Sequence, residues 1–280
     1  MARPHGLKSK DLYPRVFSQY AEAYKRRLDD IMSRGEARGR LRMIELAALS
    51  PGMRVLDLAC GPGNITRLVA QQVAPGGHVF GVDLAAGMIE LAASDHPPAS
   101  DFAVMDMERL GFGDRVFDVV VCGHGLQFAP DLGQALREAA RVLRPRGALA
   151  ASVPAPSTDD RVWDLIDSVT DRYLPPAPEA IDEGATRKTV GDPETFRDAA
   201  LAAGFRTADV ETVIEEVVWP SARDLVSRLL SWWRCATRID AAGAGMQQRI
   251  LEEATAAVRD EYPGTITTHG RNLVLTARTR

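Results

Sequence analysis

The sequence predicts an α/β fold in which a mostly parallel sheet carries helices on both faces. Three observations predict it. Short apolar runs alternate with stretches of helical spacing over residues 51–153. A glycine-rich turn, Gly61-Pro62-Gly63, separates one such run from a helical stretch, and Asp83 ends the next apolar run. Parallel strands joined by crossover helices satisfy this alternation.

The length and composition are those of a globular protein. The 280 residues can bury a substantial core, and the apolar fraction of 45% and charged fraction of 26% are ordinary. A net charge of −4 argues against a nucleic-acid partner. The absence of a long apolar run and of an apolar signal core predicts a cytoplasmic protein without a membrane span. Cys60, Cys122 and Cys235 lack metal-ligand spacing, so we expect buried free thiols and no metal.

Residues 1–50 are expected to form an N-terminal helical cap. Apolar and aromatic side chains recur at helical spacing over residues 14–32, with Tyr20 and Tyr24 on the stripe. A second helical stretch, residues 39–49, ends before a proline and a glycine. The two tyrosines could cover a ligand or could simply pack in the core.

The segment around the glycine turn has the pattern of a nucleotide-binding site. Glycines let a backbone approach a ligand closely, the following helix offers free N–H groups, and Asp83 could accept both hydroxyls of a ribose. The dinucleotide fingerprint has a glycine where this chain has Thr66, and a carboxylate at Asp57 would repel a pyrophosphate. S-adenosylmethionine, which has an ammonium group, a sulfonium and a ribose but no phosphate, suits these residues. An ordinary tight turn is the alternative, and the spacing to Asp83 argues against it.

The motif Asp57-Leu58-Ala59-Cys60-Gly61-Pro62-Gly63 resembles that of the class I S-adenosylmethionine-dependent methyltransferases. Within this family it is similar to the small-molecule branch related to the ubiquinone and menaquinone methyltransferases. The resemblance implies a Rossmann-like seven-stranded sheet with a helical lid, with S-adenosyl-L-methionine as cofactor and S-adenosyl-L-homocysteine as product. The residues that it assigns to the cofactor are Tyr24, Asp57, Ala59, Gly61, Gly63, Asp83, Leu84, Met88, Asp106, Met107 and Cys122.

Within that set the resemblance implies separate contacts. Asp57 and the backbone of the glycine turn would hold the methionine part, and Asp83 would hold the ribose. Asp106 ends a short strand 23 residues after Asp83, where the family places an acid on the adenine amino group. The run Phe117 to Cys122 is the implied fourth strand, whose end would lie beside the reacting methyl group. Standing alone, Asp106 would be interpreted as a plain turn aspartate.

Candidate catalytic residues follow the fourth strand and precede the last one. A phenol or enol acceptor needs a general base within hydrogen-bond reach. His124 is the first candidate, and a loop histidine without a chemical task is its alternative. Gln127 stands where many relatives have a histidine; it cannot act as a base but could orient an acceptor. His269, just before the last strand, could face a lid or lie on the surface.

The chain is expected to divide into the cap, a cofactor-binding core over residues 51–153, and residues 154–280. The last part would complete the same domain, with lid insertions at about 154–195 and 219–268. Acceptor contacts are predicted for Tyr20, His124, Trp232 and Trp233. Adjacent helical residues point about 100° apart, so at most one of the two tryptophans would face the acceptor.

The predicted function is methyl transfer to a small, largely apolar metabolite, in specialised (natural-product) metabolism. The composition, rich in alanine and arginine, is compatible with that setting. A quinone-type C-methyltransferase and a methyltransferase-fold enzyme that catalyses a cyclisation or rearrangement are the alternatives. A cofactor-binding regulator is disfavoured by the complete cofactor motif. The expected partner is a small-molecule acceptor, and the chain could form a homo-oligomer. Carbon, oxygen and nitrogen remain open as the methylated atom.

Overall fold

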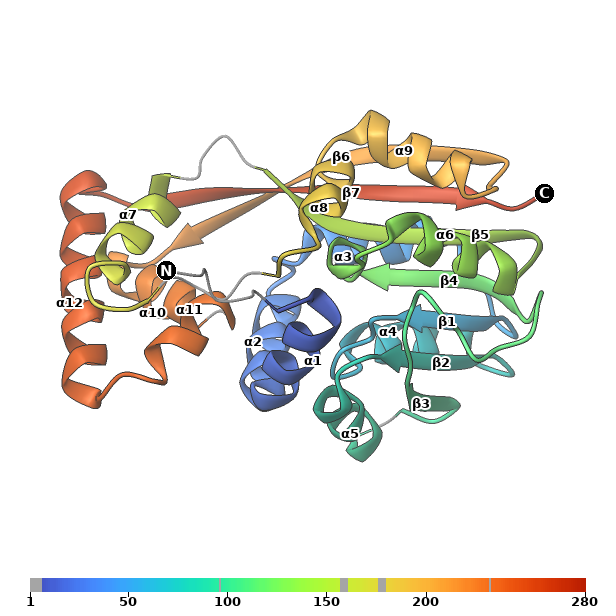
Figure 1. Cartoon of the computed structure of the whole chain (residues 1–280), viewed down its shortest axis with the longest axis horizontal. Coiled ribbons are helices and arrows are strands. Elements are labelled where there is room, and N and C mark those ends of the chain that lie inside the picture. Colours follow the sequence, from blue (N-terminus) through green and yellow to red (C-terminus); the bar gives the residue numbers. More distant parts are fainter. Residues whose placement is uncertain (1–6, 96, 157–160, 176–179, 232) are drawn as a thin grey trace. The chain divides into compact units, whose positions relative to one another are not determined.

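The computed structural model describes residues 7–95, 97–156, 161–175, 180–231 and 233–280 (Figure 1). The chain forms two compact units. The first, here called the core unit, extends to Pro156 and also contains Ala180–Ile214 and Arg271–Arg280. The second, here called the helical unit, contains the described part of residues 157–179 and Glu215–Gly270.

A seven-stranded sheet has the order β3-β2-β1-β4-β5-β7-β6. Its strands are β1 (Arg54–Leu58), β2 (His78–Asp83), β3 (Ser100–Val104), β4 (Phe117–Gly123), β5 (Leu143–Ala155), β6 (Thr207–Trp219) and β7 (Ile266–Arg278). Strands β1 to β5 run parallel, and β7 is antiparallel to β5. Both β6 and β7 contribute residues to both units. The predicted mostly parallel seven-stranded sheet is confirmed.

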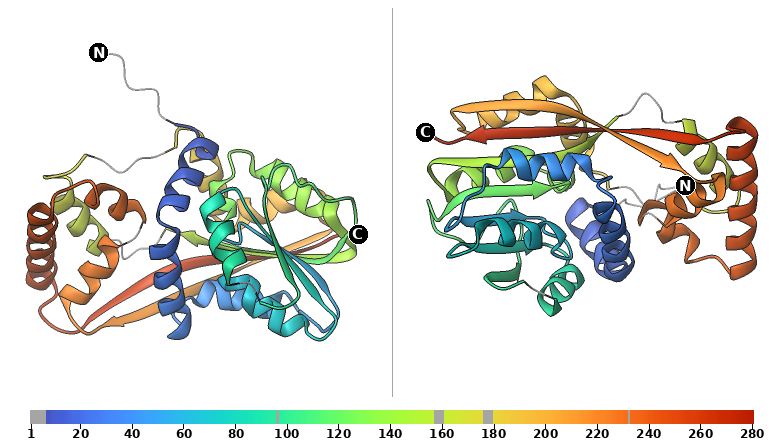
Figure 2. Two further views of the ribbon diagram at one scale, coloured as in Figure 1. Left: turned by 90° about the horizontal axis from the view of Figure 1, so that it is seen from below. Right: turned by 180° about the vertical axis from the view of Figure 1, so that it is seen from behind.

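Helices of the core unit cover both faces of the sheet, as Figure 2 shows from two further sides. The helices of the core unit are α1 (Ser9–Gln19), α2 (Ala21–Ser33), α3 (Arg38–Leu46), α4 (Asn64–Val73), α5 (Ala86–Ser94), α6 (Leu132–Val142), α8 (Gly184–Val190), α9 (Pro193–Ala202) and the 3₁₀ helix η1 (Leu126–Phe128). On one face Ile65 of α4 packs in a cluster with Val55 of β1. On the other face Leu136 of α6 packs in a cluster with Leu56.

The alternation of side chains along β1 decides where its aspartate points. Leu56 and Leu58 belong to the cluster under α6, whereas Val55 belongs to the cluster under α4. Asp57 therefore faces α4, and there the Thr66 hydroxyl donates a hydrogen bond to its Oδ2 at 2.6 Å.

Two predictions for the flanking segments need correction. The predicted single helix over residues 14–32 is two helices, because Tyr20 between α1 and α2 has a non-helical φ of −105° and ψ of 14°. Residues 180–195, predicted as part of a lid, belong to the core unit. The physical reason is that α8 packs on η1 and α9 packs on α6, which buries Val190 and Phe196 in the main core.

The helical unit has its own apolar core. Its helices are α7 (Arg161–Thr170), α10 (Ala222–Leu230), α11 (Trp233–Ile239) and α12 (Ala244–Glu261). Ile166, Leu225 and Ile250 are fully buried in one cluster there. A break between α11 and α12 falls where the sequence has its run of glycine and alanine. Within the described residues, every helix is too short or too polar to cross a bilayer.

Candidate functional site

A pocket of the core unit lies where the parallel strands end. Its empty space is about 820 Å³, counting the part open to solvent. We call the residues that follow β1 to β4 (Ala59, Gly61, 83–85, 105–108 and 123–125) the strand-end wall, and the residues from α1 (Ser9, Lys10, Tyr13, Pro14 and Phe17) the α1 wall. The predicted site residues that line this pocket are Tyr24, Ala59, Gly61, Asp83, Leu84, Met88, Asp106, Met107 and His124.

The glycine turn leaves room for a ligand. Gly61 has a left-handed φ of +55°, and a Cβ added to it would have no atom within 4 Å. Gly63, at φ +83°, is the N-cap of α4, and its Cβ would instead touch Phe102 at 3.4 Å. Gly61 therefore faces the open pocket, whereas Gly63 shapes the turn and packs against β3.

Asp83 presents its carboxylate to the pocket at the end of β2. Its Oδ2 accepts a hydrogen bond from the Gly61 N–H at 2.9 Å, and its Oδ1 accepts one from the Ala85 N–H at 2.8 Å. Each oxygen keeps a lone pair for a further donor. Burial raises the pKa of Asp83, and these backbone bonds oppose that rise. A carboxylate held in this way can accept the two hydroxyls of a ribose.

Asp57 lies behind the turn and does not line the pocket, in contrast to the direct contact that was expected. Its side chain is fully buried, and its Oδ1 has no hydrogen-bond partner among the described residues. Burial raises the pKa of Asp57 to about 7, with a smaller contribution from the charge of Asp83. A buried carboxylate with an unused oxygen favours a cationic or hydrogen-bond-donating neighbour, because either offsets the cost of its charge.

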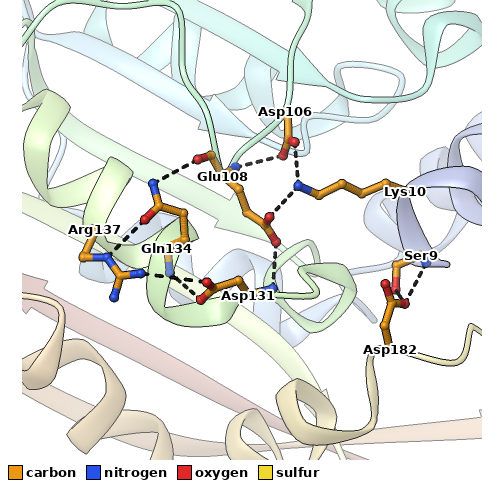
Figure 3. A network of polar contacts seen from close by, with 8 residues as sticks. All are labelled: Ser9, Lys10, Asp106, Glu108, Asp131, Gln134, Arg137 and Asp182. Carbon is orange, nitrogen blue, oxygen red and sulfur yellow. Dashed lines mark hydrogen bonds and ion pairs between the residues drawn. The ribbon is translucent and has the colours of Figure 1, made fainter.

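Asp106 belongs to a polar network that joins the two walls (Figure 3). Its Oδ2 pairs with the Lys10 ammonium at 2.7 Å, and its Oδ1 accepts the Glu108 N–H at 2.9 Å. Lys10 also pairs with the Glu108 carboxylate. Nearby, the Ser9 N–H and hydroxyl both donate to Asp182, at 2.8 and 2.6 Å. These contacts tie the beginning of α1 to the rest of the core unit.

Aromatic rings from α1 and η1 gather on the pocket. The ring centroid of Phe128 lies 4.7 Å from that of Tyr13 and 5.5 Å from that of Phe17. Tyr24 stands edge-on to Phe17 at 5.7 Å. All four residues line the pocket, which gives it an apolar, aromatic side.

His124 follows β4 and lines the pocket with an unusual backbone. Its φ is +66°, a conformation that non-glycine residues adopt rarely, and its N–H donates to the Ser152 carbonyl at 2.8 Å. Its Nε2 is buried without a hydrogen-bond partner among the described residues. Burial holds the pKa of His124 well below 6.5, the Arg40 guanidinium lowers it further, and a side-chain hydrogen bond with Asn272 opposes both. The imidazole is therefore neutral at pH 7.

The structure corrects the expectations for Gln127 and Cys122. Gln127 is 4% exposed, and its Nε2 donates to the His124 carbonyl at 2.8 Å, so the amide caps a loop rather than facing the pocket. Cys122 is fully buried in β4, where its side chain belongs to the main apolar core. Neither residue lines the pocket.

The remaining predicted residues lie elsewhere in the chain. Tyr20 joins α1 to α2 and does not line the pocket. His269 lies within β7 in the helical unit, 3.6 Å from the Glu216 carboxylate. Trp232 lies outside the described residues, and Trp233 is the first residue of α11 in the helical unit. Whether these tryptophans or His269 meet an acceptor stays a prediction.

Sequence reasoning missed Lys10, Tyr13, Arg40 and Asn272. Lys10 and Tyr13 precede the apolar stripe of residues 14–32, and only tertiary packing turns their helix toward the strand ends. Arg40 and Asn272 are 5% and 2% exposed and lie beside His124, yet no local motif marks them. The sequence does not mark a single polar residue in a helix or strand as part of a site, because its neighbours in the fold are not known at that stage.

Comparison with known proteins identifies the class. Residues 56–151 match the family model of the methyltransferase domain. The Nocamycin O-methyltransferase of Saccharothrix syringae is 30% identical over 259 residues, which cover 84% of this chain and 85% of the relative. The 2-phytyl-1,4-naphtoquinone methyltransferase of Synechococcus elongatus is 33% identical, covering 69% of this chain and 88% of its own. The YcgJ protein of Bacillus subtilis shares the fold with a TM-score of 0.55 at 18% identity, over 87% of this chain and 98% of that one.

The chain therefore belongs to the S-adenosylmethionine-dependent methyltransferases, a class I enzyme related to the quinone methyltransferases. Its cofactor is S-adenosylmethionine, as the sequence predicted.

The residues of the pocket fit this cofactor. Gly61 leaves open space where any side chain would intrude, and Asp83 offers two acceptors suited to a diol. The Asp57 Oδ1 lies behind the same turn and has no hydrogen-bond partner among the described residues. Its negative charge suits the ammonium group of the cofactor's methionine part. Leu84 and Met88 supply apolar surface beside Asp83.

Proposed function

We propose that the protein transfers a methyl group to a small, largely apolar metabolite in natural-product metabolism. The observation that carries the proposal is the aromatic cluster of Tyr13, Phe17 and Phe128 on the pocket. Such rings bind an apolar acceptor by contact area and keep water away from it. The natural-product setting is supported by the likeness to the Nocamycin O-methyltransferase over most of the chain.

The residues of the strand-end wall would bind and orient the cofactor. Asp83 would accept the ribose hydroxyls, and Asp106 with Met107 would meet the adenine. Asp57, which lies behind this wall, would compensate the ammonium group. The bound cofactor supplies a methyl group on a sulfonium, which is already a good leaving group. The main task of the protein is therefore to hold an acceptor in line and to exclude water.

His124 is our candidate for the group that removes the acceptor's proton. It lines the pocket, its ring is neutral at pH 7, and its Nε2 is without a partner among the described residues. A neutral imidazole nitrogen can accept a proton from an enol or phenol within hydrogen-bond reach. Its low pKa makes it a weak base, which suits an acidic hydroxyl better than an alcohol.

A quinone-type C-methylation is the second candidate. It is supported by the likeness to the 2-phytyl-1,4-naphtoquinone methyltransferase over 69% of this chain. A reduced quinone is aromatic, apolar and carries acidic hydroxyls, so the same aromatic side and the same His124 would serve it. A cyclisation or rearrangement without methyl transfer is a further possibility, which an assay distinguishes from methyl transfer by the mass of the product.

The test is an acceptor panel with mass spectrometry. Purified protein is incubated with S-adenosylmethionine and with enols, phenols or reduced naphthoquinones, and both the product mass and the release of S-adenosylhomocysteine are measured. A product with one added methyl group and stoichiometric S-adenosylhomocysteine supports the proposal, and its fragmentation identifies the methylated atom. An isomerised substrate without S-adenosylhomocysteine would contradict it and favour the cyclase alternative.

A lid role for the helical unit, homo-oligomerisation and cytoplasmic location stay predictions. Light scattering after size-exclusion chromatography measures the oligomeric state. Trp232→Ala and Trp233→Ala test the lid: if either tryptophan contacts the acceptor, the KM for the acceptor rises while the affinity for S-adenosylhomocysteine is unchanged. No change in either variant would contradict an acceptor contact.

A further inference from the structure

Glu183 is a buried carboxylate of the core unit that does not line the pocket. It is the N-cap residue of α8, and its side chain is only 8% exposed. Its Oε1 pairs with the Nε of Arg187 at 2.8 Å, whereas its Oε2 has no hydrogen-bond partner among the described residues. Burying a charge pair is costly and adds little net stability, so stability alone does not account for this pair.

The ion pair contacts two aromatic rings that line the pocket. The Arg187 guanidinium lies 5.4 Å from the ring centroid of Phe128, within the range of a cation–π contact. Its Nη2 donates a hydrogen bond of 3.5 Å to the Tyr13 hydroxyl. Burial raises the pKa of Tyr13, a side-chain hydrogen bond with Glu183 raises it further, and Arg187 opposes both. The Tyr13 hydroxyl therefore keeps its proton and donates to the Glu183 carboxylate, which can only accept.

Glu183 and Arg187 can act on the pocket only through these rings. Neither of the two charged residues lines the pocket, whereas Tyr13 and Phe128 both do. The two ring centroids lie 4.7 Å apart, although the rings come from different parts of the chain, α1 and η1. Because α8 packs on η1, one short helix supplies both the packing and the two charges that hold these rings relative to each other.

The helical unit contains the same three residue types in an exposed cluster. The Tyr173 hydroxyl donates to the Glu253 Oε1 at 2.6 Å, and the Arg249 Nε pairs with the same oxygen at 3.0 Å. The Arg249 guanidinium lies 5.1 Å from the centroid of the Tyr173 ring. There the carboxylate side chain is 31% exposed and the arginine side chain 61%, so water solvates both charges. Tyr173 does not line the pocket, which makes this cluster a control of the same chemistry.

We propose that Glu183 and Arg187 are positioning residues, which fix the rings of Tyr13 and Phe128 so that the pocket selects aromatic over saturated acceptors. The proposal rests on the proposed function, because it takes the aromatic cluster to be the acceptor side. Aromatic rings attract one another in particular relative orientations, and a well-oriented pair gains up to about tenfold in affinity beyond its contact area. A saturated ring makes the same area of contact without this orientational gain, so rings held in place favour an aromatic ligand.

The test uses Glu183→Gln, which removes the charge and keeps the shape, and Glu253→Gln as the matched control. Glu253→Gln makes the same change in the exposed cluster of the helical unit. The probes are 1-naphthol and decahydro-1-naphthol, which share a carbon skeleton and a hydroxyl and differ only in the saturation of the rings. Calorimetry with S-adenosylhomocysteine present measures the affinity for each probe, and a separate titration measures the affinity for S-adenosylhomocysteine itself.

We expect Glu183→Gln to lose about 3- to 10-fold in affinity for 1-naphthol and little for the decahydronaphthol or for S-adenosylhomocysteine. Glu253→Gln should leave all three affinities unchanged. Affinities of Glu183→Gln that equal those of Glu253→Gln overturn the proposal, and so do equal losses for both naphthols, because general damage to the pocket would not distinguish them. Wild-type protein that binds S-adenosylhomocysteine but neither naphthol would instead contradict the proposed function, so the two failures can be told apart.

Tyr13→Phe is a second variant, which keeps the ring and removes only the hydroxyl that Glu183 holds. It should show the same selective loss for 1-naphthol, and adding it to Glu183→Gln should cause no further loss, because both changes break one contact. Additive losses would mean that Glu183 does not act through Tyr13 and would overturn the proposal. If Glu183→Gln fails to fold, Tyr13→Phe decides alone, and an unchanged ratio of the two naphthol affinities then overturns the proposal.

Discussion

The two walls of the pocket are held in place by different interactions. The strand-end wall consists of backbone turns and partly buried carboxylates, and Asp83 accepts two backbone N–H groups at the end of a buried strand. The α1 wall consists of aromatic rings and is held partly by ion pairs of Lys10, whose side chain is 37% exposed. The strand-end wall is set rigidly by the sheet register. The α1 wall depends on one helix staying docked. A wall of this kind can open more easily, so we expect the acceptor to enter on this side.

Gly61→Val should break the strand-end wall with the largest effect. The isopropyl group would project into the open space at Gly61, and a β-branched residue resists a φ of +55°. We expect binding of S-adenosylhomocysteine to become undetectable by calorimetry, while circular dichroism shows a retained fold. Gly35→Val is the control, since Gly35 has a similar φ of +69° and open space but lies outside the pocket. Normal binding by Gly61→Val would mean that the cofactor does not lie over this turn.

Much of the strand-end wall could be predicted from the sequence because its determinants are local. A buried strand, a left-handed glycine and an acid at the next strand end follow one another within the printed sequence, and the sheet brings them together in a fixed way. The orientation of Asp57 away from the pocket follows from the alternation along β1 but was not foreseen. The prediction that Gln127 faces the pocket is wrong, because a 3₁₀ turn directs its amide to the His124 carbonyl.

The α1 wall could not be predicted in this way. Lys10, Tyr13 and Phe17 meet partners far away in the sequence, such as Asp106 and Phe128. Helical spacing shows that apolar residues share a face, but it does not say which surface that face covers. The proximity of Arg40 to His124 is likewise visible only in the structure.

His124→Ala tests whether a base on the strand-end wall acts on an acceptor that the α1 wall holds. If Nε2 accepts the acceptor's proton, we expect turnover to fall by about 10²- to 10⁴-fold with little change in affinity for S-adenosylhomocysteine. The base must be neutral, and its pKa lies well below 6.5, so wild-type activity should persist on acidification through pH 6.5 and decline only at lower pH. His269→Ala is the companion variant. Full activity of both would mean that the acceptor needs no protein base.

Asp57→Asn should change the pH dependence of stability, because it removes the buried charge that lies behind the strand-end wall. The folded pKa of about 7 lies above the unfolded value of 3.8, so the folded state binds more protons between these values. This group therefore makes the unliganded protein less stable as pH rises from about 4 to about 7, by on the order of 4 kcal/mol. Denaturant unfolding measures the free energy of unfolding at pH 5 and pH 8. Relative to the wild type, Asp57→Asn should be more stable at pH 8 than at pH 5. An unchanged difference between the two pH values would contradict the raised pKa.

Lys10→Met probes the α1 wall and should have the smallest effect. Partly exposed ion pairs contribute at most about 1 kcal/mol, so the free energy of unfolding should fall by no more than that. Affinity for S-adenosylhomocysteine should stay within a few-fold, because Asp106 then remains available to the cofactor. A loss above tenfold would mean that Lys10 itself holds the cofactor and that the division between the walls is wrong.

The central claim is that the strand-end wall binds the cofactor through Asp83, and calorimetry with S-adenosylhomocysteine on Asp83→Ala tests it most directly. The variant loses two charge-assisted hydrogen bonds to the ribose, which should cost about 2–4 kcal/mol, or roughly 30- to 1,000-fold in Kd. Asp101→Ala is a suitable control, because Asp101 is an exposed aspartate on the neighbouring strand and does not line the pocket. We expect this loss with the control unchanged, whereas equal affinity of Asp83→Ala and the wild type would mean that Asp83 does not hold the ribose.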